Sequence, residues 1–281
     1  MISFLTGLIG NGIGASGSPA LHQAEADAQG IRLVYTILDL AARGEGAESL
    51  AATLDAAERV GFAGVNVTHP YKQAVIAHLD ALSDDAERIG AVNTVSFAGG
   101  KRTGYNTDVT GFAENILRGL DGAPLRSVVQ MGAGGAGAAT AHALMRLGVA
   151  QLTLHDADRA RAQDLIDRLN AVYGEDRVTL GTKLAQSLDT ADGVVNATPM
   201  GMVPYPGTSV PANLLRANLW VADIVYVPAE TDLLRLARAR GCRTVDGRGM
   251  VVFQAADAFE IFTGLAANKE RMLARFLAEY R

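Results

Sequence analysis

The chain has 281 residues and a formal net charge of −5, with 49% hydrophobic and 20% charged residues. This length and composition predict one large or two medium globular domains with a sizeable apolar core. Because the charge balance is acidic and no run of basic residues occurs, we expect no nucleic-acid partner.

The cysteine content and the N-terminal segment narrow the protein class further. Cys242 is the one cysteine, so no internal disulfide can form, and no Cys/His cluster has zinc-site spacing; we expect no metal site. The first Lys or Arg is Arg32, so the apolar N-terminus lacks the cationic start of a signal peptide. No apolar run reaches membrane-spanning length. We therefore expect a soluble cytoplasmic protein with no membrane partner.

The first part of the chain alternates strand-like and helix-like segments. This alternation predicts a βα domain with a largely parallel sheet. We expect strands at residues 3–9, 33–38, 64–68 and 91–95, and helices at 19–29, 47–60, 74–82 and 111–120.

Two serines, Ser16 and Ser18, precede the first expected helix, which Pro19 opens. Ser18 is a plausible N-cap, because proline suits the first helical turn. A helix start with free amides and a second hydroxyl also suits a carboxylate. Capping and anion binding both remain open for this pair.

The segment Gly64-Val-Asn66-Val-Thr68-His-Pro70-Tyr-Lys72 places three polar groups near the end of an expected strand. Asn66 and Thr68 alternate along the strand and so point to the same side. Pro70 is expected to open a helix, with Lys72 in its first turn. An amide, a hydroxyl and an ammonium could thus converge on one small polyhydroxy ligand. The alternative is an ordinary strand–turn–helix with a solvated lysine.

Two more polar residues stand out before the middle of the chain. Asn93 lies within an apolar expected strand, where a buried amide needs a backbone, water or ligand partner. Asp108 precedes the helical pattern at 111–120, where it could cap the helix or belong to a site.

A second unit begins near Leu125 with an expected strand at 127–131, followed by Gly132-Ala133-Gly134-Gly135-Ala136-Gly137 and an alanine-rich helix. Strand, G-x-G-x-x-G and helix together are typical of a dinucleotide-binding Rossmann unit. The first glycine allows the tight turn, the second lets the backbone approach a pyrophosphate, and the last allows close helix packing.

The following strand ends in His155-Asp156-Ala157-Asp158. An acidic residue at this place binds the ribose 2′-hydroxyl of NAD. It would repel the 2′-phosphate of NADP by roughly 1–4 kcal/mol per charge pair. Arg159 and Arg161 favour the phosphate instead, but two carboxylates at the strand tip predict NAD, with NADP disfavoured.

Further expected strands lie at 178–180, 193–197, 219–225 and 242–245, followed by a helix at 250–263 that carries Gln254 and a final amphipathic helix. The loop at 196–202 follows the carboxyl end of a strand. Such loops line the cofactor crevice of a doubly wound sheet.

These motifs, taken in order, resemble the shikimate/quinate dehydrogenases over nearly the whole chain. They are Ser16-x-Ser18-Pro19, Asn66-Val-Thr68-x-Pro70-x-Lys72, Gly90-Ala-Val-Asn93-Thr94, Asn106-Thr107-Asp108, Gly132-Ala-Gly134-Gly135-Ala-Gly137, Asn196-Ala-Thr198-Pro199-x-Gly201 and Gly247-x-x-Met250-x-x-x-Gln254-Ala.

The resemblance implies an α/β enzyme with an N-terminal βα substrate domain (1–107, completed by 250–281) and a Rossmann domain with a doubly wound parallel sheet (108–249). It implies reversible hydride transfer between a nicotinamide and a ring hydroxyl of shikimate or quinate, a small polyhydroxy ring carboxylate. The products are 3-dehydroshikimate or 3-dehydroquinate, and the shikimate reaction belongs to aromatic amino acid biosynthesis. We expect a monomer or a homodimer.

The resemblance also assigns roles to residues. The catalytic pair is Lys72 with Asp108, and no metal is needed. Residues expected to bind the substrate carboxylate or ring hydroxyls are Ser16, Ser18, Asn66, Thr68, Asn93, Tyr226 and Gln254. Residues expected to bind the cofactor are Gly132, Ala133, Gly134, Gly135, Ala136, Asp156, Asp158, Arg161, Thr198, Met200, Val225, Gly247 and Met250.

The chain departs from the family's biosynthetic members at several positions. His155-Asp156-Ala157-Asp158 replaces the Asn-Arg-Thr-type clamp of NADP-binding members, and His69-Pro70-Tyr71-Lys72 resembles the NAD-using quinate/shikimate branch. Ser18 stands where quinate users often carry threonine, and Phe262 where many members carry tryptophan, which we expect to be a packing change.

Two other functions stay open. An aminoshikimate or other polyol dehydrogenase could use the same site, since one exchanged ring substituent leaves most contacts intact. A non-catalytic NAD or metabolite sensor could share the fold, although a sensor has no need of the Lys72/Asp108 pair.

Overall fold

The structure is a computed structural model that describes residues 2–279. The chain divides into two compact units. The first runs to Thr107 and also includes Val252–Phe276, while Asp108–Val251 makes up nearly all of the second. Each unit contains one six-stranded sheet. Within the described part of the chain, no helix combines the length and the apolar character that crossing a membrane requires.

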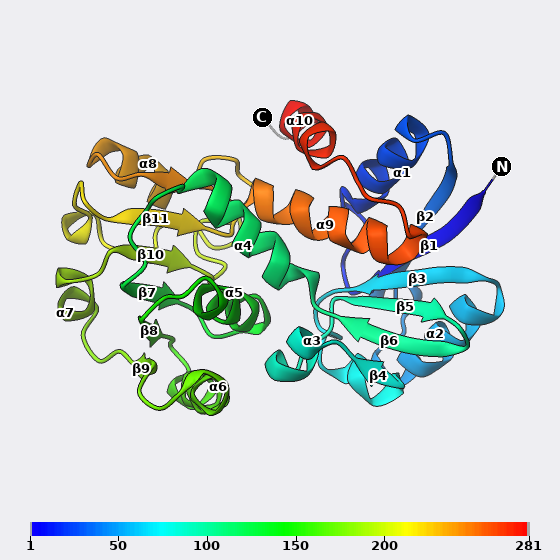
Figure 1. The fold of residues 1–281 in the computed structure, drawn as a ribbon, viewed down its shortest axis with the longest axis horizontal. Coiled ribbons are helices and arrows are strands. Elements are labelled where there is room, and N and C mark those ends of the chain that lie inside the picture. Colours follow the sequence, from blue (N-terminus) through cyan, green and yellow to red (C-terminus); the bar gives the residue numbers. More distant parts are fainter. Residues whose placement is uncertain (1, 280–281) are drawn as a thin grey trace. The chain divides into compact units, whose positions relative to one another are not determined.

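The sheet of the first unit is mixed. Its strand order is β2 (Arg32–Asp39), β1 (Ser3–Gly10), β3 (Phe62–Val67), β5 (Thr94–Ala98), β6 (Lys101–Tyr105), β4 (Ala81–Leu82) (Figure 1). β1 pairs in parallel with both β2 and β3, whereas β5 is antiparallel to β3 and to β6. The expectation of a largely parallel sheet is therefore correct for β1 to β3 and wrong for the β5–β6 side.

A tight hairpin causes this difference. Gly99 and Gly100 join β5 to β6, with φ angles of +61° and +70°, values that glycine adopts readily and that two-residue hairpin turns require. β5 runs from Thr94 to Ala98 and ends at this turn. The expected strand at 91–95, with Asn93 in its middle, was therefore placed too early, and Asn93 lies at the entrance of the strand instead.

The segment after β3 also differs from expectation. Pro70 follows a cis peptide bond and opens no helix. The expected helix at 74–82 is wrong: Ala74–His78 forms a short 3₁₀ helix, followed by β4 and by α3 (Asp84–Ile89). The backbone becomes extended at Leu79, because Asp80 pairs with Arg102 of β6 through two hydrogen bonds of 2.8 and 2.9 Å.

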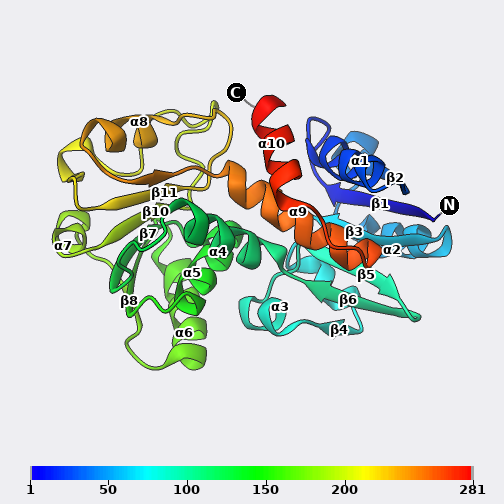
Figure 2. The ribbon, with the colours of Figure 1, turned by 45° about the horizontal axis from the view of Figure 1, so that its top comes forward.

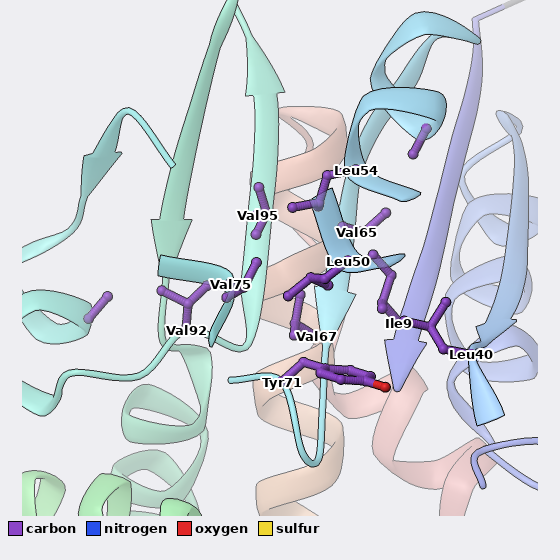
Figure 3. Close-up of a cluster of buried hydrophobic side chains, with 12 residues drawn as sticks. Ile9, Leu40, Leu50, Leu54, Val65, Val67, Tyr71, Val75, Val92 and Val95 are labelled. Carbon is purple, nitrogen blue, oxygen red and sulfur yellow. The ribbon is translucent and has the colours of Figure 1, made fainter. Parts of the chain in front are cut away.

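Apolar side chains cover both faces of this sheet, because successive strand residues point to opposite sides. On one face, Ile9 and Val65 pack against Leu50 and Leu54 of α2 (Leu50–Arg59), and Tyr71 closes one end of the cluster (Figure 3). The Tyr71 hydroxyl points toward the end of β1 in Figure 3 and donates a 2.7 Å hydrogen bond to Asn11 Oδ1.

The other face is covered by α1 (Ser18–Ala28) and by α9 (Arg248–Thr263). Leu8, Leu33 and Tyr35 of the strands pack there with Ala26 and Phe259, and Figure 2 shows α1 alongside β1 and β2. This face matters for function, because Tyr35 brings a hydroxyl group into it.

The second unit has a wholly parallel sheet. Its strand order is β12 (Thr244–Val245), β11 (Trp220–Asp223), β10 (Gly193–Asn196), β7 (Ser127–Met131), β8 (Gln151–His155), β9 (Val178–Leu180). Read from β9, the order is that of a Rossmann fold, with its switch point between β7 and β10. The predicted doubly wound sheet is confirmed, and ligands of such sheets bind beyond the carboxyl ends of the strands at that point.

The helices of the second unit follow the βα pattern: α4 (Thr107–Gly119), α5 (Gly135–Arg146), α6 (Arg159–Tyr173), α7 (Leu184–Asp189) and α8 (Asp232–Ala239) (Figures 1 and 2). Leu188 of α7 and Leu233 of α8 pack on Val129, Val194 and Val221 of the sheet. These apolar contacts hold the strand ends, and the loops that follow them, in place.

Candidate functional site

The first unit places two serine hydroxyls at the N-terminus of α1. Ser18 is the first residue of that helix, and Gly17 occupies the cap position without a side-chain cap hydrogen bond. Ser18 as N-cap is therefore wrong. The two hydroxyls lie 3.1 Å apart, and Ser16 Oγ accepts the Ser18 N–H at 3.3 Å. A helix N-terminus that bears two hydroxyls can hold a carboxylate.

Tyr35 lies between this serine pair and Asn66. Its hydroxyl donates a 2.7 Å hydrogen bond to Asn66 Oδ1, and Ser18 lies close enough to lower the pKa of this hydroxyl against the effect of burial. Burial raises the pKa of Tyr35, so the hydroxyl stays protonated. The ring of His22 stacks on it with a centroid distance of 4.7 Å, and burial lowers the pKa of His22 to about 3. Both rings are therefore uncharged at neutral pH.

Sequence reasoning missed Tyr35. In the sequence it is one more alternating residue of an expected strand, with no motif around it. The pairing that brings it to Asn66 depends on the order of β2, β1 and β3 in the sheet, which local pattern does not specify.

Hydrogen bonds continue from Asn66 to the other amides of the first unit. Asn66 Nδ2 donates to Thr94 Oγ1 at 2.9 Å, and Thr94 Oγ1 donates to Asn93 Oδ1 at 2.9 Å. Asn93 Nδ2 donates to Thr107 Oγ1 at 2.9 Å, and that hydroxyl donates to Gln254 Oε1 at 3.4 Å. We call this set the polar network: Ser16, Ser18, Tyr35, Asn66, Asn93, Thr94, Thr107 and Gln254.

The polar network unites five of the sequence segments that the motifs singled out, and most of its members are buried. Its groups are amides and hydroxyls, which both donate and accept hydrogen bonds. Such a set suits an uncharged polyol. Thr94 and Thr107 belong to the quoted motifs, but no role was assigned to them from the sequence.

Thr68 and Lys72 lie just beyond β3. The Thr68 N–H donates to the Ile9 carbonyl at 2.9 Å, and the Lys72 carbonyl accepts from Val92 N–H at 2.7 Å. These bonds fix the backbone on both sides of Pro70, although the expected helix is absent. Asp108 is a buried residue in the first turn of α4 and belongs to the second unit.

The glycine-rich loop of the second unit has the expected backbone geometry. Gly132 has φ +100°, and a Cβ at Gly137 would lie 2.4 Å from the Gly132 carbonyl oxygen. By contrast, a Cβ at Gly134 or Gly135 would meet no atom within 4 Å. The loop thus offers bare backbone in front of α5, as a pyrophosphate requires, and Ala133 and Ala136 belong to the same turn. The loop therefore fits a dinucleotide.

Asp156 lies against this loop. Its carboxylate accepts hydrogen bonds from Ala133 N–H at 2.7 Å, from Asp158 N–H at 2.8 Å and from the Arg161 guanidinium at 2.7 Å. Burial opposes ionisation, but these bonds outweigh it and hold the pKa of Asp156 below its usual value. Asp158 has a different position, because its side chain caps α6 by accepting the Arg161 N–H at 3.1 Å.

The residues expected to line a nicotinamide pocket occur together in the second unit. Thr198 and Met200 follow β10, Val225 follows β11, and Gly247 and Met250 stand at the start of α9. Tyr226, which is expected to bind the substrate, comes directly after Val225. A Cβ at Gly247 would lie 2.2 Å from the Ile224 carbonyl oxygen, so the backbones of these last two segments touch. Tyr226 is 39% exposed.

The candidate residues therefore form two groups, one in each unit. Lys72 and the polar network belong to the first unit, and Asp108, Tyr226 and the cofactor residues to the second. Over residues 2–279 we find no group of three or more His, Cys, Asp and Glu side chains arranged to hold a metal ion.

Comparison with known proteins agrees with this geometry. The family model described as shikimate dehydrogenase substrate binding domain matches residues 8–95, and the one described as shikimate 5'-dehydrogenase C-terminal domain matches residues 247–275. The shikimate dehydrogenase (NADP(+)) of Streptomyces avermitilis is 53% identical over 97% of this chain and 94% of its own. The quinate/shikimate dehydrogenase (NAD(+)) of Corynebacterium efficiens is 49% identical over 98% of each chain.

Solved structures show the same relationship. Quinate dehydrogenase from Corynebacterium glutamicum in complex with NAD is 48% identical, covers 99% of this chain and 100% of its own, and superimposes with a TM-score of 0.94. The resemblance drawn from the sequence motifs is thereby confirmed. The chain belongs to the shikimate/quinate dehydrogenase family of oxidoreductases.

Proposed function

We propose that the protein, as a monomer or homodimer, transfers a hydride between NAD and a ring hydroxyl of shikimate or quinate. The observation that carries this proposal is the polar network, in which hydrogen bonds run from Tyr35 through Asn66 and Asn93 to Gln254, with the serine pair of α1 near the Tyr35 hydroxyl. An anion-binding helix end beside uncharged amides and hydroxyls matches a ring that bears one carboxylate and several hydroxyls.

Within this proposal the serine pair holds the substrate carboxylate, and Tyr226 is a further substrate-binding residue. Thr68 and the amides of the polar network bind the ring hydroxyls. Because a hydrogen bond from Tyr35 fixes Asn66, this amide needs little rearrangement when a substrate binds, and preorganisation of this kind lowers the cost of binding.

The reaction needs a proton acceptor beside the carbinol oxygen. When bound, NAD supplies the hydride acceptor. A base within hydrogen-bond reach must take the O–H proton as the hydride leaves, and we assign this role to Lys72, with Asp108 as the second catalytic residue. In the reverse direction the cationic Lys72 polarises the ketone and returns the proton.

The preference for NAD rests on Asp156. The relatives named above include users of both cofactors, so they do not decide between them. The Asp156 carboxylate is ionised at neutral pH, and its hydrogen bond to Ala133 places its charge beside the glycine-rich loop. Arg161 already pairs with it at 2.7 Å, so recruiting this arginine for a 2′-phosphate would cost an ion pair.

Initial rates in a grid of shikimate or quinate against NAD or NADP test the proposal, with NADH or NADPH absorbance as the signal. We expect the highest kcat/KM with NAD and at least one of the two ring acids. NADP-dependent oxidation of shikimate alone would overturn the cofactor assignment. A folded protein that binds NAD but oxidises neither acid would overturn the substrate assignment and favour an amino- or otherwise modified ring.

A further inference from the structure

A buried carboxylate, Asp223, stands at the carboxyl end of β11. It is 2% exposed and accepts hydrogen bonds from three groups. Asn196 Nδ2 and the Val225 N–H donate to Oδ1 at 2.8 and 3.0 Å, and Thr231 Oγ1 donates to Oδ2 at 2.7 Å. All three donors are uncharged.

The donors belong to three different segments at the strand ends. Asn196 ends β10, Val225 follows β11, and Thr231 caps α8 by accepting the Leu234 N–H. One carboxylate therefore ties together the loop after β10, the loop after β11 and the start of a helix. Asn196 is 27 residues from Asp223 in the sequence, and its strand β10 adjoins the switch point of the sheet.

The bonds extend from Asn196 to residues of the proposed pocket. Asn196 Oδ1 accepts the Thr198 hydroxyl at 2.6 Å, and Asn196 Nδ2 also donates to the Met200 carbonyl at 3.0 Å. Thr198 Oγ1 in turn accepts the Met200 N–H at 3.2 Å. The conformation of residues 196–200 thus depends on a side chain whose own orientation is set by Asp223.

The same segments touch the glycine-rich loop and Gly247. A Cβ at Gly132 would lie 2.6 Å from the Ala197 carbonyl oxygen, and one at Gly247 would lie 2.2 Å from that of Ile224. A shift of either loop would therefore reach the cofactor-binding backbone directly. We call the set of Asp223, Asn196, Thr198, Val225 and Thr231 the Asp223 network.

A carboxylate is a costly choice for this position. Burial raises the pKa of Asp223, and the neighbouring Asp246 raises it further, against the three hydrogen bonds. Burying a charge is unfavourable even when hydrogen bonds satisfy it. An amide or a hydroxyl could also link the two loops. A carboxylate makes stronger and more directional hydrogen bonds, so its presence indicates that the positions of these loops must be precise.

We propose that Asp223 is a positioning residue that holds the loops after β10 and β11 so that Thr198, Met200 and Val225 line the nicotinamide pocket. This inference rests on the proposed function for the location of that pocket. Asp223 itself acts through Asn196 and the Val225 backbone.

The test compares the affinities of NAD and ADP-ribose, measured by calorimetry on the whole protein. ADP-ribose has the same adenosine and pyrophosphate as NAD but lacks the nicotinamide. In Asp223→Asn, which keeps the side-chain shape, we expect NAD to bind about tenfold more weakly, while ADP-ribose stays within about twofold of wild type. We also expect kcat to fall while KM for the ring acid changes little.

Asp192→Asn is the matched control. Asp192 is also a buried carboxylate beside this sheet, but it precedes β10. It accepts hydrogen bonds from the backbone N–H groups of Arg126 and Ser127. It therefore lies at the amino-terminal ends of the strands, whereas the proposed pocket lies at their carboxyl ends. This variant should lower thermal stability without changing the ratio of NAD to ADP-ribose affinity.

Thr231→Val removes one donor to Asp223 and should shift the same ratio in the same direction, with Thr231→Ser restoring it. If Asp223→Asn does not fold, the affinity ratio of Thr231→Val tests the inference in its place. Equal ratios in wild type, Asp223→Asn and Thr231→Val would overturn the inference, as would parallel weakening of both ligands. A wild-type protein that fails to bind NAD would instead overturn the proposed function, whereas one that binds NAD but oxidises neither ring acid leaves this inference testable.

Discussion

Single side chains in this protein combine opposing electrostatic effects. Asp156 is half-buried and Asp223 buried at strand ends, and the pKa of Asp156 is lowered while that of Asp223 is raised. Asp156 receives a guanidinium hydrogen bond in addition to backbone N–H groups, whereas the donors to Asp223 are neutral. The first is therefore a fixed negative charge beside the proposed ribose site, and the second is a hydrogen-bond centre within the protein.

The role proposed for Lys72 predicts a separation of binding from turnover. Lys72→Ala should retain calorimetric binding of the ring acid and of NAD, because the polar network and the glycine-rich loop are untouched. It should lose kcat by about 10²–10⁴, the usual contribution of a positioned acid–base group. Lys101→Ala, an exposed lysine of β6, serves as the control. Turnover that survives in Lys72→Ala would refute the assigned base.

The charge of Asp156 predicts cofactor choice. Asp156→Asn keeps an oxygen that can accept the Ala133 N–H but removes the negative charge and frees Arg161. We expect kcat/KM with NADP to rise relative to NAD by about tenfold, equal to about 1.4 kcal/mol and within the range of one screened charge pair. Kinetics with both cofactors measure this. Asp164→Asn, on the exposed side of α6, should leave the ratio unchanged, and an unchanged ratio in Asp156→Asn would remove the basis for the NAD preference.

At the scale of helices and strands, the sequence was most informative where one pattern dominates. β7, the glycine-rich loop and α5 follow one another with the predicted bounds to within a few residues, because an apolar run, three spaced glycines and an alanine-rich helix each permit one local structure. The 3₁₀ helix at Ala74–His78 was missed because its apolar spacing resembles that of an α-helix. The β5–β6 hairpin was missed although Gly99-Gly100 is a turn signal.

In the candidate site, too, local sequence patterns could be predicted and contacts between distant segments could not. The motif residues could be named from the sequence because their types and spacing are specific. The roles of Tyr35 and Asp223 could not, because what distinguishes them is contact between segments remote in sequence: β2 with β3 for the first, and β10 with β11 for the second. Hydrogen bonds of this kind depend on strand order, which periodicity alone does not supply.

Two glycines of one turn should respond differently to the same substitution. A Cβ at Gly137 would lie 2.4 Å from a backbone carbonyl oxygen, whereas one at Gly135 would meet nothing within 4 Å. Gly137→Ala should therefore lower the free energy of unfolding by about 1–3 kcal/mol. Gly135→Ala should not lower it, because alanine favours the helix, yet it should weaken NAD binding by covering bare backbone.

Urea unfolding without cofactor and NAD calorimetry separate these effects. Equal unfolding free energies for the two variants would show that the turn relaxes around the added methyl group. Unchanged NAD affinity in Gly135→Ala would show that the pyrophosphate does not approach this turn.

At the scale of the whole chain, polar contacts join sequence-distant segments within each unit. In the first unit, Glu25 of α1 is the main example. Its carboxylate accepts two hydrogen bonds from Arg271 of α10 (Lys269–Glu279) at 2.6 and 2.9 Å, and one from the Asn268 N–H at 2.9 Å. These bonds attach the C-terminal helix to the first helix of the chain.

This attachment predicts how stability depends on pH. Burial opposes the ionisation of Glu25, but the hydrogen bonds from Arg271 and Asn268 outweigh it, and the pKa of Glu25 is lowered. A lowered pKa in the folded state stabilises the protein above the pKa of the unfolded chain, about 4.3 for Glu, and this contribution is lost as pH falls through the lower folded value. Glu25→Gln should therefore lower Tm at neutral pH and lose less Tm than wild type between about pH 5 and pH 3.

Calorimetric Tm values across that range measure the difference, with Glu260→Gln, an exposed carboxylate of α9, as the control. If the wild type and Glu25→Gln lost Tm in parallel on acidification, other carboxylates would set the acid limit, and Asp39 and Asp156, whose pKa values are also lowered, would be the next to replace. In the proposed function NAD binds the second unit, whereas Glu25 belongs to the first. The effect of NAD on Tm therefore tests whether the two units unfold in one cooperative transition. NAD should raise the Tm of Glu25→Gln at acid pH only if the two units unfold together, since a ligand stabilises the cooperative unit that binds it.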